Sequence, residues 1–198
     1  MTRKLTARGE QRRADLIALA TRRFAEKGYH PTSVAELVEG LGVGKGVFYW
    51  YFSSKEELFR AILKDAQVEL RRAQRAALID AVDPLAQIGA GIRASVHWSA
   101  ANTDLVILVA FAATDERFAP MLRRGEQIAI ADTVKLVMAG IERGLIPDGD
   151  PEVLATAMIG VTTSLTRRLL SGQATSEARI DALADASVRF CLGGLLAS

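Results

Sequence analysis

The stretch GLGVGKGVFYWYF, residues 40–52, decides how this chain is interpreted. It has glycines at positions 40, 42, 44 and 46, a single lysine at 45, and aromatic side chains at every position from 48 to 52. Glycines beside a lysine are typical of loops that bind nucleotide phosphates. Aromatic side chains beside a lysine are typical of surfaces that bind nucleic acid.

The spacing within this stretch does not fit a phosphate-binding loop. Such a loop follows a strand and reads G-x-x-x-x-G-K-[ST], but Lys45 is followed by Gly46 and the first glycine position holds Glu39. The dinucleotide pattern G-x-G-x-x-G fails as well, because its last glycine would fall on Lys45 or Val47. We therefore do not expect a nucleotide site here.

Composition indicates a soluble globular protein. Of the 198 residues, 49% are apolar and 24% are charged, and the single cysteine excludes an internal disulfide. The basic N-terminus leads into no apolar segment, and no run of 18 apolar residues occurs. We expect a cytoplasmic protein without a signal peptide or a membrane span.

Charge is distributed unevenly along the chain. Residues 1–75 hold 15 lysines and arginines against nine acidic residues, whereas residues 76–198 hold 10 against 14. A basic front part suits a protein that presents one end to a polyanion. The alternative is an ordinary fluctuation of local charge.

Helical spacing of apolar residues dominates the sequence and predicts an all-α fold. Thr32 or Ser33 is expected to cap a helix with Glu36 in a capping box, Ser54 to cap another, and Asp83-Pro84 to start a third. The expected helices cover 10–27, 32–39, 45–51, 54–79, 84–100, 103–113, 115–143, 150–171 and 175–196. Residues 1–53 are predicted to form one domain and residues 54–198 a second.

The quoted stretch fits a helix-turn-helix. Two short helices joined by a turn with glycines place the second helix in the major groove of DNA. Glycines at 44 and 46 allow close approach to DNA, although Gly costs about 1 kcal/mol in a helix interior. Lys45, Tyr49 and Trp50 are expected to face outward. The inward residues are expected to be Val47, Phe48 and Phe52, packed on Phe24, Leu37 and Val38.

Four segments, FAEKGY at 24–29, TSV at 32–34, GVGKGVFYWYF at 42–52 and SKEELF at 54–59, resemble the DNA-binding domain of the tetracycline-repressor (TetR) family. The resemblance covers about residues 10–60. It implies an all-α homodimeric regulator, usually a repressor, that a small-molecule effector releases from a palindromic DNA operator. No cofactor is implied.

The resemblance also assigns DNA-binding positions. The residues that match are Thr32, Ser33, Gly44, Lys45, Gly46, Val47, Tyr49, Trp50 and Lys55. The resemblance implies that Lys45 contacts a phosphate or a base edge, and that Tyr49, Lys55 and either Thr32 or Ser33 contact phosphates. The family usually has Ser at position 44, Thr or Ser at 47 and His at 50, so we expect a different operator preference. For Tyr49 and Trp50 the alternative is core packing. Arg3, Lys4 and Arg8 form either an arm on DNA or a solvated tail.

The C-terminal part is predicted from the layout of the family, with weaker residue assignments. The two last helices are expected to form a four-helix bundle with a partner subunit through Leu154, Met158, Val161, Leu165, Leu183, Val188, Cys191 and Leu195, or to use these residues in the core of the subunit. An effector pocket is expected around His97, Trp98, Phe111, Phe118, Met121 and Met138, although side chains of these kinds, taken one at a time, are more often core residues than ligand contacts.

Enzymatic activity is not expected. The two histidines and one cysteine lack metal-ligand spacing, and Ser164 lacks the G-x-S-x-G pattern of a nucleophile elbow. The rival classes are a helical small-molecule-binding or scaffold protein without sequence-specific DNA binding, and a protein that coats DNA nonspecifically.

Overall fold

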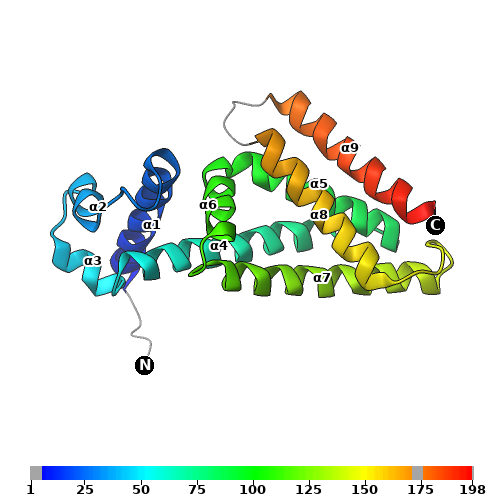
Figure 1. Ribbon diagram of the computed structural model, residues 1–198, viewed down its shortest axis with the longest axis horizontal. Coiled ribbons are helices and arrows are strands. Elements are labelled where there is room, and N and C mark those ends of the chain that lie inside the picture. Colours follow the sequence, from blue (N-terminus) through cyan, green and yellow to red (C-terminus); the bar gives the residue numbers. More distant parts are fainter. Residues whose placement is uncertain (1–5, 171–175, 198) are drawn as a thin grey trace. The chain divides into compact units, whose positions relative to one another are not determined.

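The computed structural model describes residues 6–170 and 176–197, and every regular element in these ranges is an α-helix (Figure 1). The all-α prediction is therefore confirmed, and each expected helix is present. The helices are α1 (Ala7–Lys27), α2 (Val34–Gly40), α3 (Lys45–Tyr51), α4 (Lys55–Ala77), α5 (Pro84–Ala101), α6 (Thr103–Thr114), α7 (Ala119–Glu142), α8 (Pro151–Leu170) and α9 (Glu177–Leu196).

Side-chain caps fix where several helices begin. The Ser33 hydroxyl oxygen accepts a 3.1 Å hydrogen bond from the Glu36 backbone N–H, which caps α2 as predicted. The reciprocal half of the capping box is absent, because the Glu36 carboxylate instead binds the ammonium of Lys27. At α5, the Asp83 carboxylate accepts from the Ala86 N–H at 2.9 Å, with Pro84 in the first helical position.

The start of α7 differs from the prediction. The helix begins at Ala119 rather than at residue 115. The Asp115 carboxylate accepts hydrogen bonds from the backbone N–H and the guanidinium of Arg117, which holds a turn ahead of the helix. Pro120 then lies in the first turn, where its missing N–H does no harm.

The chain divides into two compact units, Met1–Ala66 and Gln67–Ser198, and α4 contributes residues to both. The first half of α4 belongs to the first unit, where Leu58, Phe59, Ile62 and Leu63 are buried. The sequence placed a domain boundary after residue 53, just before α4 begins, and that boundary stays a prediction.

Aromatic side chains form the core of the first unit. The rings of Phe24, Tyr29 and Phe59 contact one another, with centroids 4.8 to 5.5 Å apart. Phe48 and Phe52 are buried as predicted and attach the inner face of α3 to the core. Each fully buried side chain of this size stabilises the fold by roughly 1.5–3 kcal/mol.

The second unit is a layered helix packing in which α5 lies beside α9 and α7 beside α8 (Figure 1). Two buried clusters fill it. The larger cluster contains Ile88, Ile92, Val137, Ile146, Met158, Cys191 and Leu195, and the smaller contains Val96, Leu183 and Ala184. Ile146 packs directly on the backbone of Gly140, so closely that a side chain there would collide with it.

Within the described ranges, no single helix is both long and apolar enough to cross a membrane. Helices α5 and α6 reach that length and composition only when taken together, and they are bent by 99° at their junction.

Candidate nucleic-acid interface

Helices α2 and α3 and the short turn between them form the helix-turn-helix predicted from the quoted stretch. Gly42 adopts φ +64°, a backbone conformation that side chains other than glycine rarely take. The N–H groups of Gly42 and Val43 donate to the carbonyl oxygens of Glu39 and Val38, each at 3.0 Å, and so end α2. The turn thereby sets the direction in which α3 leaves.

The outer face of α3 is unusually rich in exposed large side chains. Tyr49 and Trp50 are each 56% exposed, and Lys45 is exposed one turn before Tyr49. Phe48, which directly precedes Tyr49, is completely buried. The outward orientation predicted for Lys45, Tyr49 and Trp50 is therefore confirmed, while their contact with DNA stays a prediction.

Gly44 and Gly46 leave open space beside Lys45. A Cβ atom added at either glycine would meet no atom within 4 Å, and neither has a positive φ. Packing within the protein therefore does not require glycine at these positions. Val47, which follows them, is half-buried.

Ser33 and Thr32 precede α2 and have different environments. Ser33 is exposed, and its hydroxyl oxygen accepts the cap hydrogen bond. Thr32 is fully buried, and its hydroxyl donates to the Gly28 carbonyl oxygen at 2.9 Å. The Thr32 side chain thus holds the end of α1 and is not exposed, so of these two predicted residues only Ser33 has a side chain at the surface.

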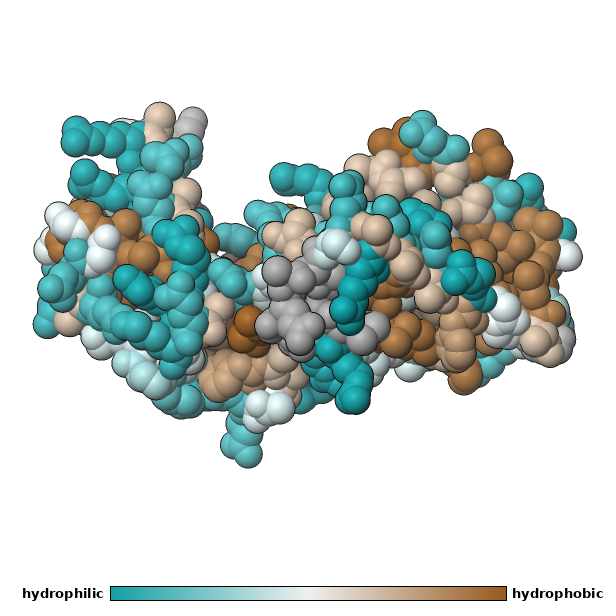
Figure 2. Space-filling model, turned by 90° about the horizontal axis from the view of Figure 1, so that it is seen from above, coloured by the Kyte–Doolittle hydropathy of each residue, from teal (hydrophilic) through white to brown (hydrophobic). Residues whose placement is uncertain are grey.

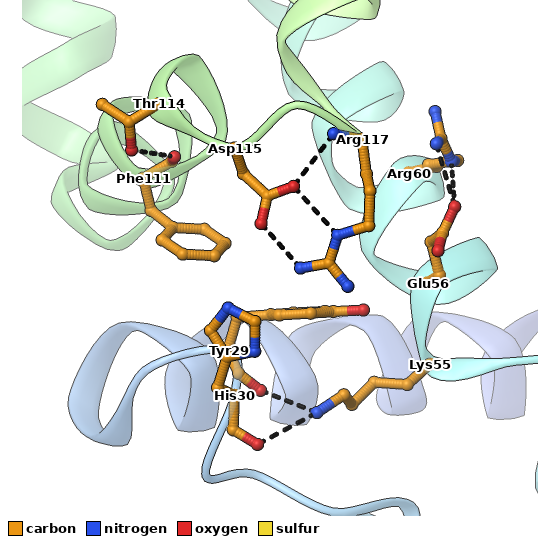
Figure 3. Close-up of polar contacts among 9 residues, drawn as sticks. All are labelled: Tyr29, His30, Lys55, Glu56, Arg60, Phe111, Thr114, Asp115 and Arg117. Atoms are coloured by element: carbon orange, nitrogen blue, oxygen red, sulfur yellow. Dashed lines mark hydrogen bonds and ion pairs between the residues drawn. The ribbon is translucent and has the colours of Figure 1, made fainter.

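Lys55 also has a different environment from the one expected. Its ammonium donates to three backbone carbonyl oxygens, those of Tyr29 at 2.8 Å, His30 at 3.2 Å and Thr32 at 2.8 Å, and the first two bonds are drawn in Figure 3. The nitrogen also lies 4.4 Å from the centroid of the Tyr29 ring. Sequence reasoning missed this contact because 23 to 26 residues separate the lysine from its acceptors.

Two carboxylates near the helix-turn-helix are held in their charged form. The hydrogen bond from Lys27 lowers the pKa of Glu36 below its usual value. The hydroxyl and the backbone N–H of Ser53 both donate to Glu57 and lower the pKa of that carboxyl. Both acids therefore stay ionised at neutral pH.

The proposed N-terminal arm is described only in part. Arg3 and Lys4 lie outside the described residues, whereas Arg8 is exposed in the first turns of α1.

The six predicted effector residues range from fully buried to exposed, and their contact with an effector stays a prediction. Phe118 is fully buried, with its ring centroid 6.4 Å from that of the half-buried Phe111. Trp98 and Met121 are also half-buried. His97 is exposed with its Nε2 atom 3.3 Å from a carboxylate oxygen of Asp181 on α9, and Met138 is 46% exposed.

The eight predicted dimer residues all contact the core of the subunit itself, although four of them are only partly buried, and their part in a dimer interface stays a prediction. Each lies in, or packs against, one of the two buried clusters of the second unit: Leu154, Met158, Val161, Val188, Cys191 and Leu195 in the larger one, and Leu165 and Leu183 in the smaller. The alternative stated with that prediction, a core role, describes their contacts here. Burial also raises the pKa of the Cys191 thiol.

The opposite faces of α8 and α9 are exposed and rich in small and apolar residues. On α8 these are Val153, Thr156, Ala157, Gly160 and Ser164, and on α9 they are Ala182, Ala186, Phe190, Gly193 and Leu196. Figure 2 shows hydrophobic surface gathered at the end of the molecule where α9 finishes. The exposed small and apolar residues recur along α8 and α9 mostly at intervals of three and four residues, and this pattern in the sequence could have identified the face.

Comparison with known proteins agrees with this architecture. Residues 16–62 match the family described as bacterial regulatory proteins, tetR family. The transcriptional regulator TtgR of Pseudomonas putida is 30% identical over 185 residues, which cover 86% of this chain and 85% of TtgR. The transcriptional repressor KstR2 of Mycobacterium tuberculosis is 40% identical over 53 residues, 27% of this chain and 26% of KstR2.

A solved structure extends the similarity of fold to almost the whole chain. The fatty acid degradation regulator FadR of Bacillus halodurans superimposes with a TM-score of 0.84 over 98% of each chain, at 19% identity. The identity is too low to indicate more than a shared fold. Together with the family match and TtgR, it leads to one conclusion: this chain belongs to the tetR family of bacterial regulatory proteins and is a helix-turn-helix transcriptional regulator.

Proposed function

We propose that this protein is a cytoplasmic repressor that binds a palindromic DNA operator as a homodimer and leaves it when a small-molecule effector binds. The observation that carries the proposal is the outer face of α3, where Lys45, Tyr49 and Trp50 are exposed beside two glycines that open space. A lysine and a tyrosine hydroxyl suit phosphate oxygens, and an indole N–H can donate to them.

The small and apolar faces of α8 and α9 support a homodimer. Small residues allow two helices to approach closely, and Phe190 at 66% exposure supplies an apolar anchor. A two-fold dimer reads two half-sites of a palindrome and doubles the number of phosphate contacts. We therefore place the partner subunit against these exposed faces rather than against the eight residues predicted from the sequence.

The effector is proposed to bind within the second unit, near the half-buried aromatic and methionine side chains that lie among its helices. Of the predicted contacts, Trp98, Phe111 and Met121 are half-buried. Effector binding would shift α4 and reduce operator affinity, with a coupling free energy of typically 1–3 kcal/mol.

Selection of operator fragments from genomic DNA by the full-length protein tests the proposal. We expect one palindrome to be enriched and its affinity to fall steeply with salt, because bound phosphates release counterions. Lys45→Ala and Tyr49→Ala should each weaken binding, whereas Lys64→Ala, at an exposed lysine on α4, should change it little.

The same experiment separates the rival functions. Failure to enrich any sequence would favour a helical small-molecule-binding protein. Salt-dependent binding without enrichment would favour a nonspecific DNA-coating protein. Equal operator affinity with and without a verified bound ligand would contradict the role of the effector.

A further inference from the structure

Lys55 lies at a convergence of backbone carbonyl groups. The carbonyl oxygens of Tyr29, His30 and Thr32 surround its ammonium at 2.8, 3.2 and 2.8 Å. Figure 3 shows the first two of these hydrogen bonds. An ammonium group has three N–H donors, so three acceptors match its full capacity. Hydrogen bonds from a charged donor are about twice as strong as those between neutral groups.

These carbonyl groups belong to the connection between α1 and α2. Helix α1 ends at Lys27, Gly28 turns the chain with φ +90°, and α2 begins at Val34. Carbonyl groups in such a connection lie outside both helical hydrogen-bond ladders and need other partners. Lys55 supplies three of these bonds from a single side chain.

The Tyr29 ring, which lies next to the ammonium, is buried and closely packed. Tyr29 is only 5% exposed, and its ring packs against those of Phe24 and Phe59. Phe59 lies one turn after Lys55 on α4. The first turns of α4 therefore contact the α1–α2 connection in two ways. Lys55 binds its backbone carbonyl groups, and Phe59 packs against the Tyr29 ring.

We propose that Lys55 is a positioning residue for DNA binding and not a phosphate contact. Its ammonium fixes the α1–α2 connection on the first turn of α4, and so fixes α2, on which α3 packs. This inference rests on the proposed function, since it concerns how the DNA-reading helix is held. A phosphate contact would require the ammonium to give up its carbonyl acceptors.

The two roles differ in their salt dependence. The logarithm of the binding constant falls with the logarithm of salt concentration by about 0.9 for each phosphate that a protein cation neutralises. Loss of a phosphate contact makes that slope shallower, whereas loss of a positioning contact weakens binding at every salt concentration equally. Variants at Lys55 and Lys45 can therefore be compared directly.

The experiment uses the full-length protein, its selected operator, and the variants Lys55→Met, Lys45→Met and Lys64→Met. Fluorescence anisotropy gives Kd between about 50 and 300 mM salt, at a temperature where circular dichroism shows each variant fully folded. We expect Lys45→Met to reduce the slope by about 1 per subunit. Lys55→Met should raise Kd about tenfold with the slope of the wild type, and Lys64→Met should change neither quantity.

Two results would overturn the inference. If Lys55→Met reduces the slope as Lys45→Met does, Lys55 is a phosphate contact. If folded Lys55→Met binds with the Kd of the wild type, the three hydrogen bonds stabilise the fold without positioning the DNA-reading helix.

Hydrogen exchange of the free protein tests the inference separately from DNA binding. We expect backbone amides of residues 28–36 to exchange faster in Lys55→Met than in Lys64→Met, because the connection loses its clamp. Unchanged exchange there would overturn the inference. Failure of the wild-type protein to select an operator would instead contradict the proposed function, and the exchange result would still decide whether Lys55 holds the connection.

Discussion

Helices α3 and α9 both carry exposed glycines, and their neighbouring side chains differ in chemistry. Gly44 and Gly46 at α3, and Gly193 and Gly194 on α9, all leave open space where a Cβ would be. At α3 the neighbours are a lysine, a tyrosine and a tryptophan, whereas on α9 they include the apolar Phe190 and Leu196 beside a single charged residue, Arg189. The first set suits a polyanion and the second suits another apolar protein surface.

Open space beside a helical glycine has a cost in stability. Glycine in a helix interior is unfavourable by about 1 kcal/mol relative to alanine. Where no atom of the subunit fills the space beside the glycine, the chemistry of the surrounding side chains indicates which kind of molecule binds there. Substitutions at the two sites should therefore have separate effects on DNA binding and on dimerisation.

Gly46→Glu should have the largest effect. A carboxylate on the outer face of α3 would meet the phosphates, and juxtaposed like charges are unfavourable by several kcal/mol. We expect operator affinity to fall at least about a hundredfold while the oligomeric state measured by light scattering stays unchanged. A Kd within about threefold of the wild type would show that α3 does not approach DNA through this face.

Phe190→Glu should mainly affect assembly. In the proposed dimer, a charge at this exposed position of α9 would be buried against the partner, so we expect dissociation to monomers and a roughly tenfold or greater loss of operator affinity. Sedimentation velocity measures the first effect. Gln127→Glu adds the same charge at an exposed position of α7 and serves as the control. A dimeric Phe190→Glu protein would move the interface elsewhere.

The prediction of the fold from sequence succeeded where local chemistry decides. Ser33, Asp83 and Pro84 define helix starts through atoms within three residues, and the aromatic run placed Phe48 inward and Tyr49 outward. The start of α7 was missed because an interaction between Asp115 and Arg117 competes with helix formation.

The proposed dimer face of the second unit could not be predicted in the same way. Both sides of α8 are uncharged over most of their length, so Met158 on one side and Ala157 on the other are equally compatible with a core or a partner. Only the packing of α5 and α7 against α8 decides that Met158 faces inward. Lys55 illustrates the same limit, since its acceptors lie in a different part of the sequence.

Matched alanine substitutions at the two sites should have smaller effects. Gly46→Ala and Gly193→Ala should each stabilise the isolated fold by about 0.5–1 kcal/mol, because alanine favours the helix and its methyl group meets no neighbour. We expect Gly46→Ala to weaken operator binding several-fold and Gly193→Ala to weaken only the dimer. Chemical denaturation, anisotropy and sedimentation measure the three quantities. Equal effects of both variants on both interfaces would contradict the distinction.

The smallest expected effect concerns pH at the start of α4. The pKa of Glu57 is lowered in the folded protein by the hydroxyl and backbone N–H of Ser53. Because the pKa is lowered in the folded state, the ionised carboxylate stabilises the fold at pH values above the usual pKa near 4.5. This stabilisation is lost as the pH falls through the folded-state pKa. Glu57→Gln should therefore unfold at a lower temperature than the wild type at neutral pH, and the difference should shrink on acidification. A constant difference in Tm would exclude this origin.

The continuity of α4 gives the molecule a mechanical property. Twenty-three residues without a break make a rod of about 34 Å. Tilting a rod of that length about one end by a single degree moves the other end by about 0.6 Å. A tilt of roughly ten degrees thus displaces the far end by about the pitch of one helical turn. Under the proposed mechanism, a small tilt of α4 on effector binding would therefore be enough to weaken operator binding.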